Sequence, residues 1–260
     1  MKDRIVVKIG SNVLTRADGT LDTTIVSSIV DQTVELRRMG YDVILVSSGA
    51  VACGRSILKP HEALDDVQQR QLFSAVGQVK LMSLYSQLFS DYGIRVAQVL
   101  TQKKNFEEGE QYENQKDCME VMLHCGVVPI VNENDTVSIT ELMFTDNDEL
   151  AGLVSSMMGA RTLVILSNID GIYDSAPDSP GAAVIRSVRP GEDISSYIQA
   201  THSRAGRGGM GSKSSVAART AAAGIRVIIA NGKRQDILIR LHCDPENTIH
   251  TEFIPSENVI

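Results

Sequence analysis

The chain alternates short aliphatic, β-branched runs with longer helical stretches from one end to the other. The runs cover residues 4–9, 42–46, 94–99, 127–131, 162–166 and 226–229. Alternation of this kind is typical of a parallel sheet whose strands are connected through helices. We therefore predict an α/β fold class in which a mostly parallel central sheet carries helices on both faces.

The predicted helices have readable ends. Asp22 is a candidate N-cap for a helix over residues 23–39. Glycine follows the predicted C-termini of five successive helices and is followed at once by a strand; these residues are Gly40, Gly93, Gly126, Gly159 and Gly224. This rhythm again predicts layered β/α units rather than an internal sequence repeat.

Composition narrows the class of protein further. A chain of 260 residues that is 43% hydrophobic can bury a full core, and we expect a single domain over residues 1–260. The net charge of -7 and the absence of Trp argue against nucleic acid as a partner.

The first apolar run is too short for a signal sequence or a membrane span, so we expect a cytoplasmic protein with no membrane partner. The four cysteines lack C-x-x-C spacing, which favours unpaired thiols over disulfides or zinc.

Polar segments follow four of the predicted strands. They are residues 10–12, 47–50, 132–135 and 167–171. Ligands of open parallel sheets bind beyond the C-terminal ends of the strands, so these segments predict a ligand site at one edge of the sheet. By contrast, residues 175–189 have three prolines in or beside them, and we expect them to form an exposed excursion.

A glycine-rich segment, residues 206–213, ends in Lys213 and leads into a predicted helix over residues 214–223. Glycines allow backbone N–H groups to approach an anion, a helix start adds partial positive charge, and the lysine adds a mobile point charge. The order of Ser212 and Lys213 is the reverse of that in a Walker A motif, so a P-loop is not expected. The segment is a candidate phosphate cradle, and a flexible surface loop is the alternative.

Two further charged residues belong to this hypothesis. Lys8 lies within the first predicted strand, where a lysine is unfavourable unless it meets an anion; a lysine that snorkels from a sheet edge is the alternative. Two lysines, Lys8 and Lys213, could together offset the charge of a transferring phosphoryl group. The acidic segment before a helix predicted over residues 150–158 includes Asp148, which could hold both lysines or lie near a phosphate-bound metal ion.

The other two polar segments suggest an amino-acid site. The residues Ser47-Ser48-Gly49-Ala50 open a helix, so they could hold a carboxylate or simply cap the helix. The turn Asn132-Glu133-Asn134-Asp135 has more hydrogen-bonding capacity than a turn requires. We interpret it as a site for a zwitterion, with Asp135 pairing an ammonium group.

Taken together, the ordered motifs resemble those of the amino acid kinase family along essentially the whole chain. The motifs are residues 6–11, 47–50, 75–78, 132–135, 146–148 and 208–210, with Lys213. The resemblance implies a three-layer αβα sandwich with an N-terminal half that binds the amino acid and a C-terminal half that binds ATP. It implies that Lys8 and Lys213 stabilise the transferring phosphoryl group and that Asp148 organises them.

The resemblance also implies binding roles. For L-glutamate the implied residues are Ser48, Asn134, Asp135 and Asn147; for ATP they are Lys8, Ser167, Asn168, Arg207, Gly208, Gly209, Met210, Gly211, Ser212 and Lys213. Many relatives carry Asp where Asn168 stands and Thr where Arg207 stands. Many bacterial members continue into a PUA domain, which we expect this chain to lack.

The implied reaction is ATP- and Mg²⁺-dependent phosphorylation of the glutamate side-chain carboxylate, the first step of proline biosynthesis. A carboxylate with a reference pKa of about 4.3 is ionised at neutral pH, so the reaction needs no general base. A homo-oligomer and feedback inhibition by proline are expected by family analogy, while the metal ligands stay open. The alternatives are a kinase of the same fold for N-acetylglutamate, aspartate, carbamate or a nucleoside monophosphate, and a non-catalytic nucleotide or amino-acid sensor.

Overall fold

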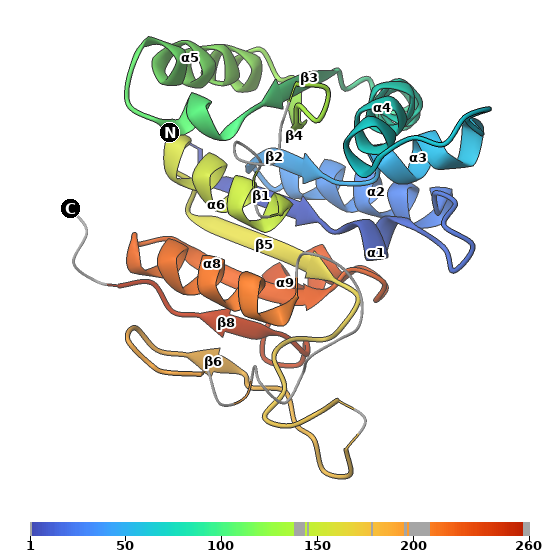
Figure 1. Ribbon diagram of the computed structural model, residues 1–260. Helices are drawn as coiled ribbons and strands as arrows, with labels where there is room; N and C mark the ends of the chain where they lie inside the picture. The colour runs from blue at the N-terminus through green and yellow to red at the C-terminus, as the bar shows by residue number, and fades with distance from the viewer. Residues whose placement is uncertain are drawn as a thin grey trace.

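A computed structural model describes residues 2–137, 144, 146–177, 179–194, 197 and 209–256 of the chain. Within these residues an eight-stranded sheet has the order β3-β4-β2-β1-β5-β7-β8-β6 (Figure 1). The strands are β1 (Arg4–Ile9), β2 (Asp42–Ser47), β3 (Val96–Thr101), β4 (Val128–Glu133), β5 (Thr162–Ser167), β6 (Ser187–Val188), β7 (Arg226–Asn231) and β8 (Thr251–Phe253). All pairings from β3 to β7 are parallel, and β8 is antiparallel to β7.

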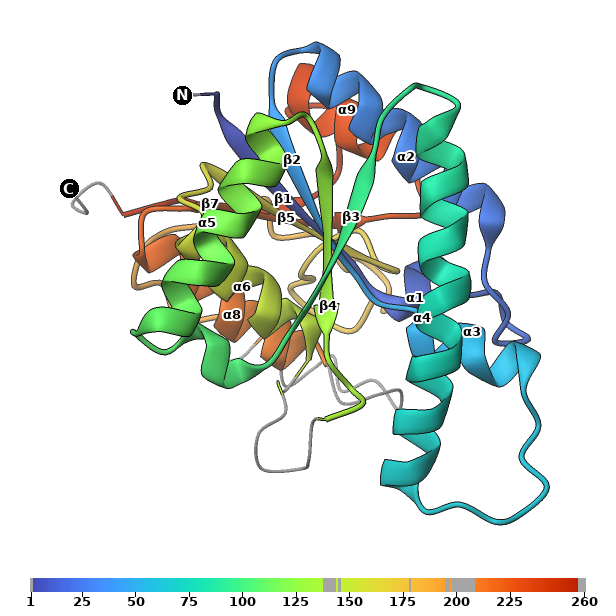
Figure 2. The ribbon, with the colours of Figure 1, turned by 90° about the horizontal axis from the view of Figure 1, so that it is seen from above.

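Helices cover both faces of the sheet, which confirms the predicted α/β layering. They are α1 (Ser11–Leu14), α2 (Thr23–Arg38), α3 (Ala50–Ile57), α4 (Asp66–Ser90), α5 (Glu110–His124), α6 (Asn147–Met157), α8 (Met210–Ala222) and α9 (Ile237–Cys243), with a 3₁₀ turn η1 (Lys103–Phe106). One core cluster joins the sheet to α2, α4 and α9, and the other joins it to α5, α6 and α8. Figure 2 shows the two groups of helices on opposite sides of the strands.

Local sequence signals place most of these elements correctly. Each of the six predicted strands is present, with bounds that differ from the prediction by at most two residues. The Asp22 carboxylate accepts hydrogen bonds from Thr24 N and Ile25 N, as expected of an N-cap. The five glycines after helices all have positive φ, which confirms their role as C-terminal stops.

Three predictions of boundaries were wrong. The helix predicted over residues 150–158 begins at Asn147, because the Asp146 carboxylate accepts from Asp148 N and Glu149 N and caps it earlier. The helix predicted from residue 214 begins at Met210, since Lys213 N already donates to Gly209 O. The predicted excursion over residues 175–189 ends in β6, which pairs with β8.

Strands β6 and β8 were not predicted from the sequence because they are only two and three residues long. In addition, Arg186 fastens the segment before β6 by donating to the carbonyls of Thr248, Pro245 and Glu246. A long-range contact of this kind leaves no local signal in the sequence. In the described part of the chain, no helix is both long and apolar enough to cross a membrane.

A close helix crossing explains one residue of the motif at 75–78. A Cβ placed on Gly77 of α4 would lie 1.8 Å from Ala50 O of α3, and one placed on Gly54 of α3 would lie 1.9 Å from Phe73 O. Glycine is therefore required at both positions for the two backbones to approach. The crossing holds the start of α3, which follows β2, against the middle of α4.

Candidate active site

Strand β1 directs Lys8 to the face of the sheet that α6 covers. Ile5, Val7 and Ile9 belong to the core cluster of α2, whereas Val6 belongs to the cluster of α6 and α8. Since side chains alternate along a strand, Lys8 points to the same face as Val6. Its side chain is 5% exposed and its Nζ lies 2.6 Å from Asp148 Oδ1.

The same carboxylate holds a second lysine. Lys213, in the first turn of α8, places its Nζ 2.8 Å from Asp148 Oδ2, and the Asp148 side chain is fully buried. The structure thus brings together the three residues that the sequence proposed as catalytic, from β1, α6 and α8. Two ammonium groups around one carboxylate leave one net positive charge at the end of β1, where an anionic group can be attracted.

Burial alone would raise the pKa of the Asp148 carboxyl, but the two lysines outweigh burial and hold its pKa below the usual value. Asp148 is therefore an ionised carboxylate in the folded protein at neutral pH. An ionised Asp148 can keep both ammonium groups in fixed positions before an anionic ligand binds.

A second acid fastens the two helices that carry this cluster. Asp146 Oδ1 caps α6, and Asp146 Oδ2 accepts a 2.6 Å hydrogen bond from Ser212 Oγ of α8. Ser212 was predicted to contact ATP, and in the structure its hydroxyl is bound to Asp146. This link connects the N-terminal turns of α6 and α8, on which Asp148 and Lys213 lie.

Amide side chains form a chain of hydrogen bonds beside Ser48. Asn147 Nδ2 donates to Ser48 Oγ and to Asn132 Oδ1, both at 2.9 Å. Asn132 Nδ2 in turn donates to Gln78 Oε1 at 3.2 Å. Two of the residues predicted to bind glutamate, Ser48 and Asn147, are therefore adjacent, and Asn147 is also the neighbour of Asp148 in sequence. The hydroxyl hydrogen of Ser48 stays available to donate to a carboxylate.

The remaining predicted amino-acid residues lie in the turn after β4. Asn134 Oδ1 accepts from Thr136 Oγ1 at 2.6 Å, which is an Asx-type turn contact. Asp135 Oδ1 accepts from Arg70 Nε of α4 at 2.6 Å, and Arg70 also contacts Glu133 Oε2 at 2.6 Å. Burial raises the pKa of Asp135, and Arg70 opposes that rise.

The predicted nucleotide residues are only partly brought together. Ser167 is buried at the end of β5, and its hydroxyl lies 3.5 Å from Asn168 Oδ1. Met210 packs its side chain into the core formed with α6, so any ligand contact there would come from its backbone. Gly209 precedes α8 as its N-cap and Gly211 is an exposed residue of the first turn. Arg207 and Gly208 lie outside the described residues.

Several residues of this edge had no individual role predicted from the sequence, although Asp170 lies in the predicted segment 167–171. Asp170, after β5, accepts from Nε and one terminal nitrogen of Arg234 at 2.5 and 2.7 Å and from Asn231 Nδ2 at 3.0 Å. These hydrogen bonds, led by that of Arg234, lower the pKa of Asp170. Arg70 and Arg234 lie in segments without a motif, so no local sequence pattern distinguishes them from ordinary surface arginines. Gln78 was within a matched motif but had been given no role.

Among the described residues, no group of three or more His, Cys, Asp or Glu side chains could hold a metal ion. Both oxygens of Asp148 face lysines, and both oxygens of Asp146 accept hydrogen bonds. The oxygens of both acids thus face protein donors, and the two lysines make the cluster suited to an anion.

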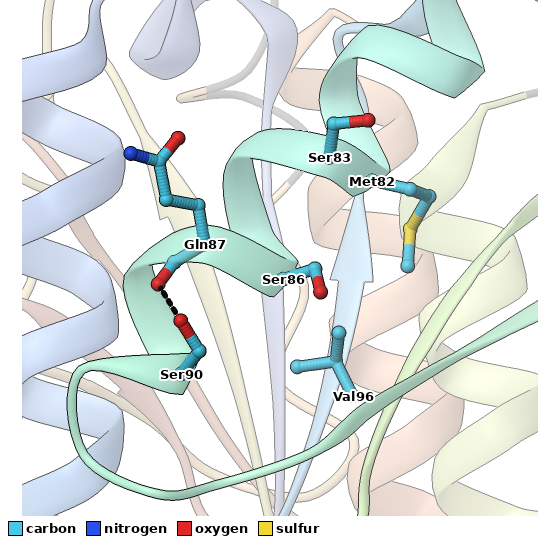
Figure 3. A pocket seen from close by; sticks show the side chains of 6 residues that line it. All are labelled: Met82, Ser83, Ser86, Gln87, Ser90 and Val96. Atoms are coloured by element: carbon cyan, nitrogen blue, oxygen red, sulfur yellow. Dashed lines mark hydrogen bonds between the residues drawn. The ribbon is translucent and has the colours of Figure 1, made fainter.

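A separate shallow groove lies along α4 and the start of β3. Figure 3 shows its lining, which consists of Met82, Ser83, Ser86, Gln87, Ser90 and Val96. Val96 begins β3, whereas the lysine cluster and the amide chain lie where the parallel strands end. The groove therefore belongs to the opposite end of the sheet and contributes no residue to the candidate site.

Comparison with known proteins identifies the family to which the chain is similar. A model described as the amino acid kinase family matches residues 3–231. The glutamate 5-kinase of Bacteroides thetaiotaomicron is 59% identical over 257 residues, covering 99% of this chain and 71% of that protein. The glutamate 5-kinase of Chlorobaculum tepidum is 46% identical over 236 residues, covering 90% of this chain and 65% of that protein.

Solved structures share the fold at low sequence identity. Carbamate kinase from Giardia lamblia bound to AMP-PNP has a TM-score of 0.69 and 16% identity, with 98% of this chain and 99% of that chain covered. UMP kinase from Ureaplasma parvum has a TM-score of 0.66 and 15% identity, with 98% and 99% covered. These two structures support the αβα sandwich.

Proposed function

The chain belongs to the amino acid kinase family, and from that premise we propose that it transfers the γ-phosphoryl group of ATP to the side-chain carboxylate of L-glutamate. The product is L-glutamyl 5-phosphate, the acyl phosphate from which proline biosynthesis starts. The observation that carries the proposal is the buried Lys8–Asp148–Lys213 cluster at the end of β1, close in sequence to Asn147. The identity to glutamate 5-kinases supports the choice of acceptor.

The lysines supply the electrostatic part of the mechanism. The transferring phosphoryl group carries negative charge on its three equatorial oxygens, and catalysis consists mainly of positioning and charge stabilisation. Lys8 and Lys213 approach Asp148 from different elements, so they are fixed on two sides of the space next to that carboxylate. Because Asp148 is already ionised, the lysines need little rearrangement when the phosphoryl group arrives.

The acceptor needs orientation rather than activation. A glutamate side chain is ionised at neutral pH, so one of its oxygens can attack the γ-phosphorus directly while ADP leaves. Ser48 and Asn147 would orient glutamate by hydrogen bonds, and Asp135 would pair with its ammonium group. The positions of these side chains, just after β2 and β4 and at the start of α6, support the roles.

MgATP enters this scheme as the substrate. Magnesium usually keeps its waters and is held through phosphate oxygens plus one or two carboxylates, and here it would shield the charge of the β- and γ-phosphates. The nucleotide would lie against the first turn of α8 and the end of β5, where Ser167, Asn168 and Lys213 are found. Binding of free proline as an inhibitor and assembly into a homo-oligomer are parts of the same proposal that rest on the family alone.

Other acceptors fit the site less well. N-acetylglutamate has no ammonium charge for Asp135, and a nucleoside monophosphate would require additional cations in the N-terminal half. A non-catalytic sensor of nucleotide or amino acid has no need of two lysines around one buried carboxylate.

The proposal is tested by incubating the protein with MgATP and hydroxylamine and measuring hydroxamate formation from L-glutamate, N-acetylglutamate and L-aspartate in parallel. Hydroxamate from glutamate alone is expected. Product from N-acetylglutamate or aspartate instead would overturn the assignment of the acceptor. Absence of product from all three would favour the sensor.

A further inference from the structure

Arg70 reaches the amino-acid side of the site from α4 (Asp66–Ser90), a helix that supplies none of the binding or catalytic residues predicted from the sequence. Its Nε lies 2.6 Å from Asp135 Oδ1, and its terminal nitrogen lies 2.6 Å from Glu133 Oε2. The two carboxylate side chains are only 8% and 4% exposed, whereas the Arg70 side chain is 28% exposed. One guanidinium therefore bridges two buried carboxylates at the end of β4.

The charges of this group do not cancel. Two carboxylates and one guanidinium leave one net negative charge, which a single ammonium group would neutralise. Without Arg70, two buried carboxylates would face the same space, and like charges in that position favour uptake of a proton by one of them. Arg70 thus keeps both acids ionised while removing one unit of their charge.

We propose that Arg70 is a positioning residue that fixes Asp135 and sets the amino-acid site to accept one ammonium group. The inference rests on the proposed function, because it takes the Asp135 carboxylate as the partner of the substrate ammonium. In this arrangement Arg70 occupies Oδ1 of Asp135 and leaves Oδ2 for the substrate. The net negative charge of the three side chains disfavours acceptors whose amine is acylated, since these bring no cation to the two carboxylates.

Arginine suits this task better than lysine does. The planar guanidinium donates in two directions at fixed angles, so it can hold Glu133 and Asp135 at the same time. Lysine would supply the charge from a single point. It would therefore preserve the charge of the site while loosening the orientation of Asp135.

The charges around Asp135 determine the expected response to pH. The charged groups in contact with Asp135 among the described residues are Arg70 of α4 and, through its guanidinium, Glu133 of β4. Burial raises the pKa of Asp135, and Arg70 opposes this. Removal of Arg70 would raise that pKa further, so protonation would weaken ammonium binding at a higher pH than in the wild type.

The test compares Arg70→Met, Arg70→Lys and the control Lys80→Met, which removes one positive charge from an exposed position of the same helix. Steady-state hydroxamate kinetics are measured between pH 5.5 and 9. For Arg70→Met we expect the KM for glutamate to rise roughly 10- to 100-fold, the range of a hydrogen bond to a charged group. We expect kcat and the KM for ATP to change by less than about threefold. On acidification, kcat/KM for glutamate should begin to fall at a higher pH than in the wild type.

Arg70→Lys should have a smaller rise in KM and the pH profile of the wild type, and Lys80→Met should match the wild type in both. Wild-type turnover is measured first, because its absence would refute the proposed function. Normal wild-type turnover with an unchanged glutamate KM in Arg70→Met would refute the role of Arg70. If Arg70→Met does not fold, Arg70→Lys decides: a shifted pH profile despite the retained charge would overturn the inference.

Discussion

Replacement of Asp148 by asparagine probes the centre of the site. The variant keeps the shape of the side chain but removes the charge that lies 2.6 Å from Lys8 Nζ and 2.8 Å from Lys213 Nζ. At an effective dielectric constant of about 20, each ion pair has a gross Coulomb attraction of roughly 6 kcal/mol. Desolvation offsets much of that attraction, and removal of one partner of a buried pair lowers the free energy of unfolding by about 3–5 kcal/mol.

We therefore expect Asp148→Asn to lose about 3–5 kcal/mol of stability in urea unfolding at pH 7. Loss of the fixed lysine positions should lower kcat by roughly 10²- to 10³-fold. The control is Asp117→Asn on α5, an exposed position, which should change stability by no more than about 0.5 kcal/mol.

The pH dependence supplies an independent check. The folded-state pKa of Asp148 lies below its unfolded value of about 3.9. The ionised carboxylate therefore makes its full contribution to the free energy of unfolding above the unfolded pKa, and this contribution is lost as the pH falls through the folded pKa. The stability difference between the wild type and Asp148→Asn should hence be constant from pH 6 to 8 and decrease below about pH 4. Equal stability and turnover in both proteins, or a difference that grows on acidification, would refute this reasoning.

Three further predictions address other parts of the site and the fold. Asn147→Ala should raise the KM for glutamate about tenfold and leave the KM for ATP unchanged in the same kinetics; equal changes in both would contradict its place on the amino-acid side. Ser212→Ala removes the hydrogen bond to Asp146 that links α6 to α8, so kcat should fall about tenfold with an unchanged glutamate KM. Unaltered kcat would mean that the link does not hold Lys213 in place. The pKa of Glu252 is lowered to about 2, mainly by hydrogen bonding from Arg226. Glu252→Gln should therefore cost about 1 kcal/mol in urea unfolding at pH 7, after allowance for solvent screening, and this difference should disappear as the pH falls from about 4.5 toward 2.

The sequence predicted the sheet well because β1, β2, β4, β5 and β7 are buried along nearly their whole length. Their continuous apolar runs differ sharply from the helical segments and need no tertiary information to be recognised. The strands β6 and β8 were missed for the opposite reason, since two or three residues cannot establish a period. The pairing of Ser187 with Glu252 joins positions 65 residues apart in sequence.

The lysine cluster could be predicted because a lysine in a buried strand is itself anomalous. A buried Lys8 is unfavourable unless it meets an anion, and Asp148 and Lys213 were predicted as its neighbours from two other motifs. The three side chains meet because the Lys8 side chain points to one particular face of the sheet and because α6 and α8 cover that same face. The roles of these residues in catalysis stay predictions.

Other features depend on tertiary contacts that no local pattern encodes. Arg70 is 63 residues from Glu133 in sequence, and its helix gave no sign that it would meet a buried acid. Met210 was assigned to the nucleotide site because of its motif, yet its side chain packs into the core. A motif identifies a backbone segment, whereas the direction of each side chain is decided by the helix that the segment begins.

The proposed reaction depends on attack by a side-chain carboxylate oxygen of glutamate on the phosphorus of the phosphoryl group that ATP supplies. This step is tested with L-glutamate that carries ¹⁸O in both side-chain carboxylate oxygens, in the presence of MgATP and hydroxylamine. Attack forms a bond between a labelled oxygen and phosphorus; hydroxylamine then displaces phosphate from the acyl carbon, and that oxygen leaves with the phosphate. We predict inorganic phosphate with one ¹⁸O atom for each hydroxamate formed, measured by mass spectrometry, whereas unlabelled phosphate would contradict the proposed reaction.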